Sequence, residues 1–326
     1  MLSFAVLGRV GYDLFAEQQH RPLHAVRQFR AAMGGSSANI AVGLARLGAT
    51  VHMLAALPDD PLGRFLHDEL EREGIITSAL QAVSGHNVSL CLSEVSPPAG
   101  FRQVFYRNDP ADACIEWSDA IQQAIAVSAC LLTNGTSLCA DPSRATTRRA
   151  LEAARQAGRL TVLDVDYRAS SWPAPQAAGE AVRAIWHSLD ILFANADEML
   201  LLAPNARPGD EERIAREALA AGLRLVVWKQ GELGATAFSA AGRVHVPAFS
   251  VPVTSTIGAG DGFAAGFLFA YSQHLPVDLC LEYGNACAAQ VVMQVGCGEA
   301  MPTAAELEAF VQSGRQQLPQ TWQRRA

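Results

Sequence analysis

The chain has 326 residues, half of them apolar and 17% charged, and its formal net charge is −7. This apolar content can bury a sizeable core, so the composition excludes a disordered chain. An acidic chain must build any basic face against its own charge, which argues against nucleic acid as a partner. The length allows two domains or one large α/β unit with an appendage.

The sequence contains no signal for a membrane or for disulfides. No apolar run reaches the ~20 residues that a bilayer-spanning helix needs, and no basic segment precedes the apolar start of the chain. We therefore expect a cytoplasmic protein without membrane contact. The seven cysteines form no C-x-x-C pair and no zinc-like spacing, so we interpret them as reduced, buried residues.

Strands and helices alternate along most of the chain. The apolar patterns predict strands at residues 3–7, 50–57, 129–133, 160–164, 191–194 and 225–229, and turn-rich strands within 235–253. They predict helices at residues 38–47, 62–73, 143–157, about 180–188, 210–221, 260–273 and 280–294, with a last helix opened by a capping box at 302–306. Such alternation indicates a mostly parallel sheet with helices on both faces.

Two polar segments, residues 11–34 and 86–112, interrupt this alternation. The second contains two alternating runs, 87–94 and 102–106, on either side of the turn-forming residues 96–100, which is typical of a β-hairpin. We expect the two segments to form one small sheet that projects from the α/β body.

The strongest local motif is Gly258-Ala259-Gly260-Asp261, which immediately precedes an apolar helix. Small residues let the first N–H groups of a helix converge on an anion, which the helix dipole also favours. An acidic side chain would repel a bound phosphate there unless it accepts a proton from the attacking group, so Asp261 is a candidate base. The alternative is an ordinary helix-capping aspartate.

This motif closely resembles the G-A-G-D signature of the ribokinase-like (PfkB) carbohydrate kinases. Gly34, Gly35 and Asn39 resemble the G-G-x-x-x-N motif of that family, and Asp13 matches its early aspartate. The resemblance implies that these four residues bind the sugar. It also implies that Asp261 is the catalytic base and that Gly258, Ala259 and Gly260 contribute to the anion hole.

Further motifs of the nucleotide side follow in the family's order. The resemblance implies an ATP-binding role for Asn195 and Glu198 of the N-x-x-E motif, Lys229, Gly231 and Gly234 of the K-x-G-x-x-G motif, and Asn285 near the adenine. Glu198 would hold Mg²⁺ through water. The implied fold is a ribokinase-like three-layer sandwich with a mostly parallel sheet. Residues 1–326 would form one kinase domain, with a β lid built from the insertions 11–34 and 86–112.

Three segments are similar to the family members that phosphorylate 5-dehydro-2-deoxygluconate in inositol catabolism. They are residues 8–14, residues 106–113, and residues 164–168 followed by Trp172. A sugar acid carries a carboxylate that a planar guanidinium binds with two parallel hydrogen bonds, so Arg107 and Arg168 are the candidates. The alternative for each is an ion pair at the surface.

The predicted activity is transfer of phosphate from ATP to the primary hydroxyl of a sugar acid, with 5-dehydro-2-deoxy-D-gluconate as the first candidate. The alternatives are a 2-keto-3-deoxygluconate kinase, a fructokinase and a non-catalytic sugar sensor. A dinucleotide-binding oxidoreductase is disfavoured, because residues 8–11 lack the G-x-G-x-x-G spacing and no helix follows them.

The cofactor and partner predictions follow from the same resemblance. ATP and Mg²⁺ are implied. A K⁺ site would depend on backbone carbonyls, because Ser255, Thr256 and Ile257 replace the usual residues before the G-A-G-D motif. A homodimer through the lid is also implied, with Val88, Leu90, Leu92 and Val104 as candidate contacts.

Overall fold

The computed structural model describes residues 3–96 and 102–317. Its centre is an eight-stranded sheet with the order β14-β13-β12-β11-β10-β9-β1-β4. In chain order its strands are β1 (Ser3–Leu7), β4 (Thr50–Leu54), β9 (Cys130–Asn134), β10 (Leu160–Asp164), β11 (Ile191–Asn195), β12 (Leu225–Lys229), β13 (Ala235–Ser239) and β14 (Gly242–Val246). The strands from β4 to β12 are parallel, and β13 and β14 extend one edge antiparallel.

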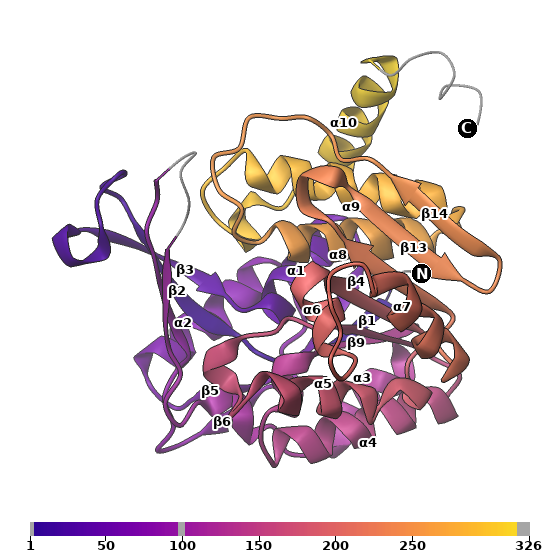
Figure 1. Cartoon of the computed structure of the whole chain (residues 1–326). Coiled ribbons are helices and arrows are strands. Elements are labelled where there is room, and N and C mark those ends of the chain that lie inside the picture. The colour runs from indigo at the N-terminus through magenta and orange to yellow at the C-terminus, as the bar shows by residue number, and fades with distance from the viewer. Residues whose placement is uncertain (1–2, 97–101, 318–326) are drawn as a thin grey trace.

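Helices cover both faces of this sheet (Figure 1). One face packs against α1 (Ser36–Arg46), α2 (Pro61–Arg72), α8 (Ala259–Ser272), α9 (Val277–Val292) and α10 (Ala304–Gln317). The other packs against α3 (Asp119–Val127), α4 (Ser143–Gln156), α5 (Pro175–Arg183), α6 (Ala196–Leu201) and α7 (Glu211–Ala220). In β1, Phe4 and Val6 belong to the first core and Ala5 and Leu7 to the second, so alternate side chains are buried on opposite faces. The predicted three-layer α/β fold is confirmed.

Some element boundaries differ from the sequence predictions. The expected strand 50–57 divides into β4 and β5 (Ala56–Pro58), and β5 pairs with β6 (Gln81–Val83) in a separate small sheet. The helix expected near 180–188 begins earlier, at Pro175, because proline suits the first helical turn. Helix α3 was missed. The capping box before α10 is confirmed by the Thr303 N–H, which donates to the Glu306 carboxylate at 2.8 Å.

The two interrupting segments pair with each other in a four-stranded lid sheet. Its order is β3 (Phe29–Gly34), β2 (Gly11–Ala16), β7 (Leu90–Ser93) and β8 (Gln103–Tyr106). The predicted turn at residues 97–100 lies outside the described residues. The strand register places Asp13, Cys91 and Phe105 side by side on one face of the lid. In Figure 1 the lid stands beside the body, on the side of α1 and α2.

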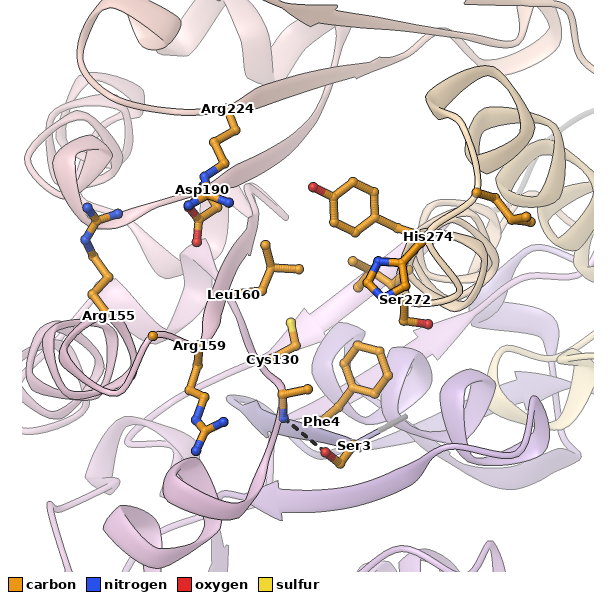
Figure 2. Close-up of a pocket in the computed structure, with 15 residues that line it drawn as sticks. Ser3, Phe4, Cys130, Arg155, Arg159, Leu160, Asp190, Arg224, Ser272 and His274 are labelled. Atoms are coloured by element: carbon orange, nitrogen blue, oxygen red, sulfur yellow. Dashed lines mark hydrogen bonds and ion pairs between the residues drawn. The ribbon is translucent and has the colours of Figure 1, made fainter. Parts of the chain in front are cut away.

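A cavity of about 870 Å³ opens where β1, β9 and β10 begin (Figure 2). Its lining includes Arg155, Arg159 and Arg224, together with the Asp190 carboxylate. Asp190 accepts hydrogen bonds from the backbone N–H and the hydroxyl of Thr161 and is 3.0 Å from the Arg224 Nε. Over the residues that the structure describes, no helix has the length and apolar character needed to cross a membrane.

Candidate active site

A second pocket, of about 270 Å³, lies between the lid and the carboxyl ends of the parallel strands. Open α/β sheets bind their ligands at this edge. The pocket brings together residues from both ends of the chain. Its lining includes Arg9, Asp13, Gly35, Ser36, Asn39, Cys91, Gln103, Phe105, Asp164, Asp166, Arg168, Asn195, Glu198, Lys229, Gly258, Gly260, Asp261 and Cys297. Most of the predicted site residues are therefore neighbours in space.

Asp261 is held by two donors from the first turns of α1. The Ser36 hydroxyl donates to Oδ1 at 2.7 Å, and the Asn39 amide donates to Oδ2 at 2.8 Å. Burial raises the pKa of Asp261 to about 7, repulsion from Asp166 adds to this, and the two hydrogen bonds oppose it. A carboxylate oriented in this way and titrating near neutral pH is suited to accept a proton.

The turn before α8 leaves backbone donors unused. Gly258 has a φ of +83°, and no side chain caps the helix. Within residues 3–96 and 102–317, no hydrogen bond is made by the N–H groups of Gly258, Gly260 or Asp261. A Cβ on Gly258 would also lie 3.1 Å from the Cα of Cys297. Glycine is therefore favoured here by the positive φ and by the limited space, and N–H groups without an acceptor are suited to bind an anion.

The paired glycines of the lid shape the predicted sugar side. A Cβ on Gly34 would lie 2.1 Å from the Asp13 Cγ, so only glycine lets that carboxylate lie against β3. Gly35 has a φ of +95°, and a Cβ there would lie 2.5 Å from the carbonyl oxygen of Arg9. Burial raises the pKa of Asp13 to about 6, and the charges of Arg9 and Arg168 oppose this increase.

The nucleotide-side motifs converge on a buried ion pair. The Lys229 Nζ lies 2.7 Å from Asp164 Oδ2. Burial lowers the pKa of Lys229, but attraction to Asp164 and Glu198 outweighs it and keeps the amine charged. A Cβ built on Gly260 would lie 3.3 Å from the Lys229 Nζ, so the amine lies beside the anion site.

Glu198 is fixed by the start of α6. Its carboxylate accepts N–H hydrogen bonds from Tyr167 at 2.9 Å and Asn195 at 2.8 Å, and Asn195 in turn accepts one from the Glu198 N–H. Asn195 and Glu198 thus form a capping box. With both carboxylate oxygens already engaged by the backbone, the remaining lone pairs suit water-mediated contact with a metal ion.

The structure separates the two predicted carboxylate-binding arginines. Arg168 lines the pocket, where its Nη2 lies 2.9 Å from Asp166 Oδ1 and its guanidinium lies 5.8 Å from the Phe105 ring centre. Arg107 is not among the pocket-lining residues. Its guanidinium pairs with Asp112 and contacts the Cys139 sulfur. The alternative placed such an ion pair at the surface, but this one is buried. Asp112 reaches it because residues 111–114 form a single 3₁₀ turn.

Five other predicted residues are not among those that line this pocket. Gly34 and Ala259 are next in sequence to lining residues, and the other three are Asn285, Gly234 and Gly231. Asn285 donates from its amide to the carbonyl groups of Val246 at 3.0 Å and Pro247 at 3.1 Å. Gly234, with a φ of +95°, approaches the same segment, since a Cβ there would lie 2.1 Å from the Val246 carbonyl oxygen. Both residues fix the chain after β14. Gly231 has a φ of +59° in the turn between β12 and β13. Their nucleotide contacts stay predictions.

Sequence reasoning missed several residues of the pocket. Asp164 and Asp166 belong to the segment 164–168, but the sequence assigned no role to these two residues. Two aspartates at the end of a buried strand are nevertheless a recognisable signal of a ligand-binding site. Ser36 and Arg9 had weaker signals, because only folding brings Ser36 to Asp261 and Arg9 to Asp13.

The fold, the buried carboxylate, the free N–H groups and the lid together define a phosphotransferase for a small polar acceptor. The pfkB family carbohydrate kinase model matches residues 1–304. The 5-dehydro-2-deoxygluconokinase of Geobacillus kaustophilus (strain HTA426) is 33% identical over 317 residues, covering 96% of this chain and 95% of that protein. The chain therefore belongs to the PfkB family of ATP-dependent carbohydrate kinases.

Solved structures agree with this assignment. A PfkB protein from Polaromonas sp. JS666 has 26% identity and a TM-score of 0.81, covering 95% of this chain and 100% of that one. A fructokinase double mutant from Vibrio cholerae O395, in a form with fructose, ADP and potassium ion bound, has 23% identity and a TM-score of 0.83. It covers 95% of this chain and 98% of that one, and at this identity it supports the fold alone.

Proposed function

We propose that this kinase transfers the γ-phosphoryl group of ATP to the primary hydroxyl of a sugar acid, with 5-dehydro-2-deoxy-D-gluconate as the substrate. The observation that carries the proposal is the arrangement around Asp261. A carboxylate with a pKa of about 7 lies in the same turn as backbone N–H groups that have no acceptor among the described residues. A proton acceptor and an anion site are the two parts that phosphoryl transfer to an alcohol requires.

In this mechanism Asp261 accepts the proton of the attacking hydroxyl. The N–H groups of Gly258, Gly260 and Asp261 donate to the oxygens of the transferring phosphoryl group, which carry more negative charge in the transition state. The hydrogen bonds from Ser36 and Asn39 keep the carboxylate in one orientation. The lid excludes water, which would otherwise compete as the nucleophile.

The acidic residues of the pocket fit a magnesium ion. Asp166 Oδ2 is buried with no hydrogen-bond partner among the described residues, and carboxylate oxygens are ligands that Mg²⁺ prefers. Glu198 would hold the ion through water, and Lys229 would contact the phosphates. Bound Mg²⁺ would neutralise phosphate charge. A K⁺ ion near Ser255 and an adenine contact of Asn285 are further parts of this proposal.

Three observations support an acid as the substrate. The curated relative above is named for an acid substrate. Arg168 lies in the pocket with its guanidinium between the lid and the body. The charges of Arg168 and Arg9 also act on Asp13, the predicted ligand of the sugar hydroxyls.

We also propose that the enzyme is a homodimer through the lid. Leu92 and Val104 pair across β7 and β8, on the face opposite Cys91 and Phe105. Val104 is 37% exposed, and the neighbouring Tyr106 is 55% exposed. Light scattering tests this part directly.

A substrate panel tests the proposed activity. Sugar-dependent ADP formation is measured with 5-dehydro-2-deoxy-D-gluconate, 2-keto-3-deoxy-D-gluconate and fructose, for the wild type and for Arg168→Ala. We expect the first acid to have the highest kcat/KM, and the variant to lose roughly 10- to 100-fold on both acids. Equal turnover of fructose, unaffected by the variant, would identify a fructokinase instead. Binding without any ADP formation would indicate a sensor.

A further inference from the structure

Arg9 is a buried positive charge that makes no ion pair with any residue that the structure describes. It follows β1 directly and lines the pocket, and it is only 6% exposed. Across residues 3–96 and 102–317, its guanidinium makes no ion pair and donates no hydrogen bond, and its Nε is fully buried. By contrast, the other two bases of the pocket are paired, Arg168 with Asp166 and Lys229 with Asp164.

A buried guanidinium destabilises the folded protein unless an acid or another hydrogen-bond acceptor pairs with it. Removing a guanidinium from water without a partner is strongly unfavourable, so buried arginines are normally paired with an acid. The charge of Arg9 acts on the Asp13 carboxylate, but no direct hydrogen bond joins the two side chains in the described part of the chain. Burial keeps the pKa of Asp13 at about 6 in spite of that attraction. Asp13 therefore acts on Arg9 only through its charge, and the N–H donors of the Arg9 guanidinium have no acceptor among the described residues.

Arg168 has spare donor capacity beside Arg9. Its Nε is also buried without a hydrogen-bond partner among the described residues, although its Nη2 is used by Asp166. Both guanidinium groups act on the same two side chains, Asp13 and Cys91 of the lid. The pocket therefore offers two converging guanidinium groups with unused N–H donors.

We propose that Arg9 and Arg168 together bind the carboxylate of the substrate, and that Arg9 takes the position that the sequence suggested for Arg107. This inference rests on the proposed function, since it requires an acid as the substrate. Carboxylate oxygens accept from planar guanidinium groups with good geometry, and two such groups would share the negative charge. Arg9 then determines specificity: it favours acids over neutral sugars and has no part in the chemical step.

A purely structural role for Arg9 leads to a different expectation. If Arg9 only orients Asp13, its loss would weaken every sugar that uses the Asp13 carboxylate. If it binds the substrate carboxylate, acids would be affected much more than neutral sugars. The ratio of kcat/KM for an acid to kcat/KM for a neutral sugar separates these two roles.

The experiment compares Arg9→Gln, Arg9→Lys and Arg30→Gln with the wild type. KM and kcat are measured with 5-dehydro-2-deoxy-D-gluconate and with fructose at saturating MgATP, and Tm is recorded for each protein. Arg30→Gln is the matched control, because Arg30 lies on the lid strand β3 but pairs with Glu299 outside the pocket. A control ratio equal to that of the wild type is required for the comparison.

We expect Arg9→Gln to raise KM for the acid roughly 10- to 100-fold, with little change in kcat. The change in KM for fructose should be much smaller, because fructose is affected only through the lost charge beside Asp13. Arg9→Lys restores the charge without the planar fork, so its KM should be intermediate. Arg9→Gln removes a buried charge that has no ion-pair partner among the described residues, so the Tm of this variant without substrate should not fall.

Three outcomes would overturn the inference, and they are distinguishable. If the wild type prefers the acid but Arg9→Gln lowers kcat/KM equally for acid and fructose, or changes neither, Arg9 is not a carboxylate ligand and the proposed function stands. If the wild type does not phosphorylate the acid at all, the proposed function fails and the carboxylate site fails with it. A large loss of Tm in Arg9→Gln without rescue in Arg9→Lys would show a structural role.

Discussion

Charged groups line both edges of the central sheet, where the parallel strands begin and where they end, but the partners of these groups differ. At the edge where the parallel strands begin, the Asp190 carboxylate accepts two hydrogen bonds from Thr161 and pairs with Arg224, all within 3.0 Å. At the edge where they end, Asp261 has a raised pKa, and the nearby N–H groups of α8 find no acceptor in the described part of the chain.

This difference separates structural charges from functional ones. Buried polar groups are normally satisfied by the protein itself, as around Asp190. Polar groups without hydrogen-bond partners at the other edge lower the stability of the fold. Such groups are retained in proteins where a bound ligand supplies the missing partners. The cavity in Figure 2 is the larger of the two, yet its buried carboxylate already has its partners. The presence of polar groups without hydrogen-bond partners therefore indicates the candidate active site better than the volume of the cavity does.

The largest predicted effect comes from replacing the carboxylate of the functional edge. Asp261→Asn keeps the size of the side chain and a hydrogen bond from Asn39 but removes the proton acceptor. We expect kcat to fall roughly 10²- to 10⁴-fold with little change in sugar binding. Steady-state kinetics and calorimetric titration with the sugar acid measure the two quantities. Retention of more than about a tenth of kcat would contradict the assignment of the base.

The anion site gives the next largest effect. Gly258→Ala places a Cβ at a φ of +83° and 3.1 Å from Cys297, so the turn must move and its N–H groups lose their alignment. We expect kcat to fall roughly 10- to 100-fold. Gly48→Ala is the matched control, because Gly48 has a φ of +89° but nothing within 4 Å. The control should lose stability and keep its activity; an equal loss of activity in both variants would indicate strain alone.

The pH dependence follows from the pKa of Asp261. Below a pH of about 7 the carboxyl is protonated and cannot accept a proton, so kcat/KM should fall about tenfold per pH unit there and level off above it. The raised pKa also means that the folded state binds this proton more tightly than the unfolded state. Its stabilising effect is lost as the pH rises from 4 towards 7.

At pH 8, therefore, Asp261→Asn should unfold at the same Tm as the wild type or above it. Thermal melts at pH 5 and pH 8 measure this difference. A lower Tm for the variant at pH 8 would show that the buried charge of Asp261 stabilises the fold. That result would contradict the view that the charges at this edge lower stability.

The smallest effect on activity is expected at the other edge. Asp190→Asn retains an acceptor for Thr161 but loses the ion pair with Arg224. The stability should fall by about 1 kcal/mol, or a few degrees in Tm, because a charged acceptor is replaced by a neutral one. The kcat should change less than twofold. A catalytic loss comparable with that of Asp261→Asn would remove the distinction between the two edges.

The sequence predicted the body of the fold because its elements are defined by local apolar periodicity and by glycine turns. It indicated the candidate base and the candidate anion site, because both lie in one continuous motif, residues 258–261. It misplaced Arg107, since whether an arginine is paired depends on a turn that brings Asp112 to it. It assigned no role to Arg9, because the burial of this arginine and its place in the pocket depend on the packing of the lid against the body.

The junction between the lid and the body has a mechanical consequence. Strand β3 ends at Gly34, and α1 begins at Ser36, so one residue, Gly35, separates the lid from a hydrogen-bond donor of the base. Any tilt of β3 is therefore transmitted through covalent geometry to Ser36 and Asn39. The position of the lid and the orientation of Asp261 therefore cannot vary independently. Contacts made far out on the lid should change the turnover number as well as the affinity for the substrate.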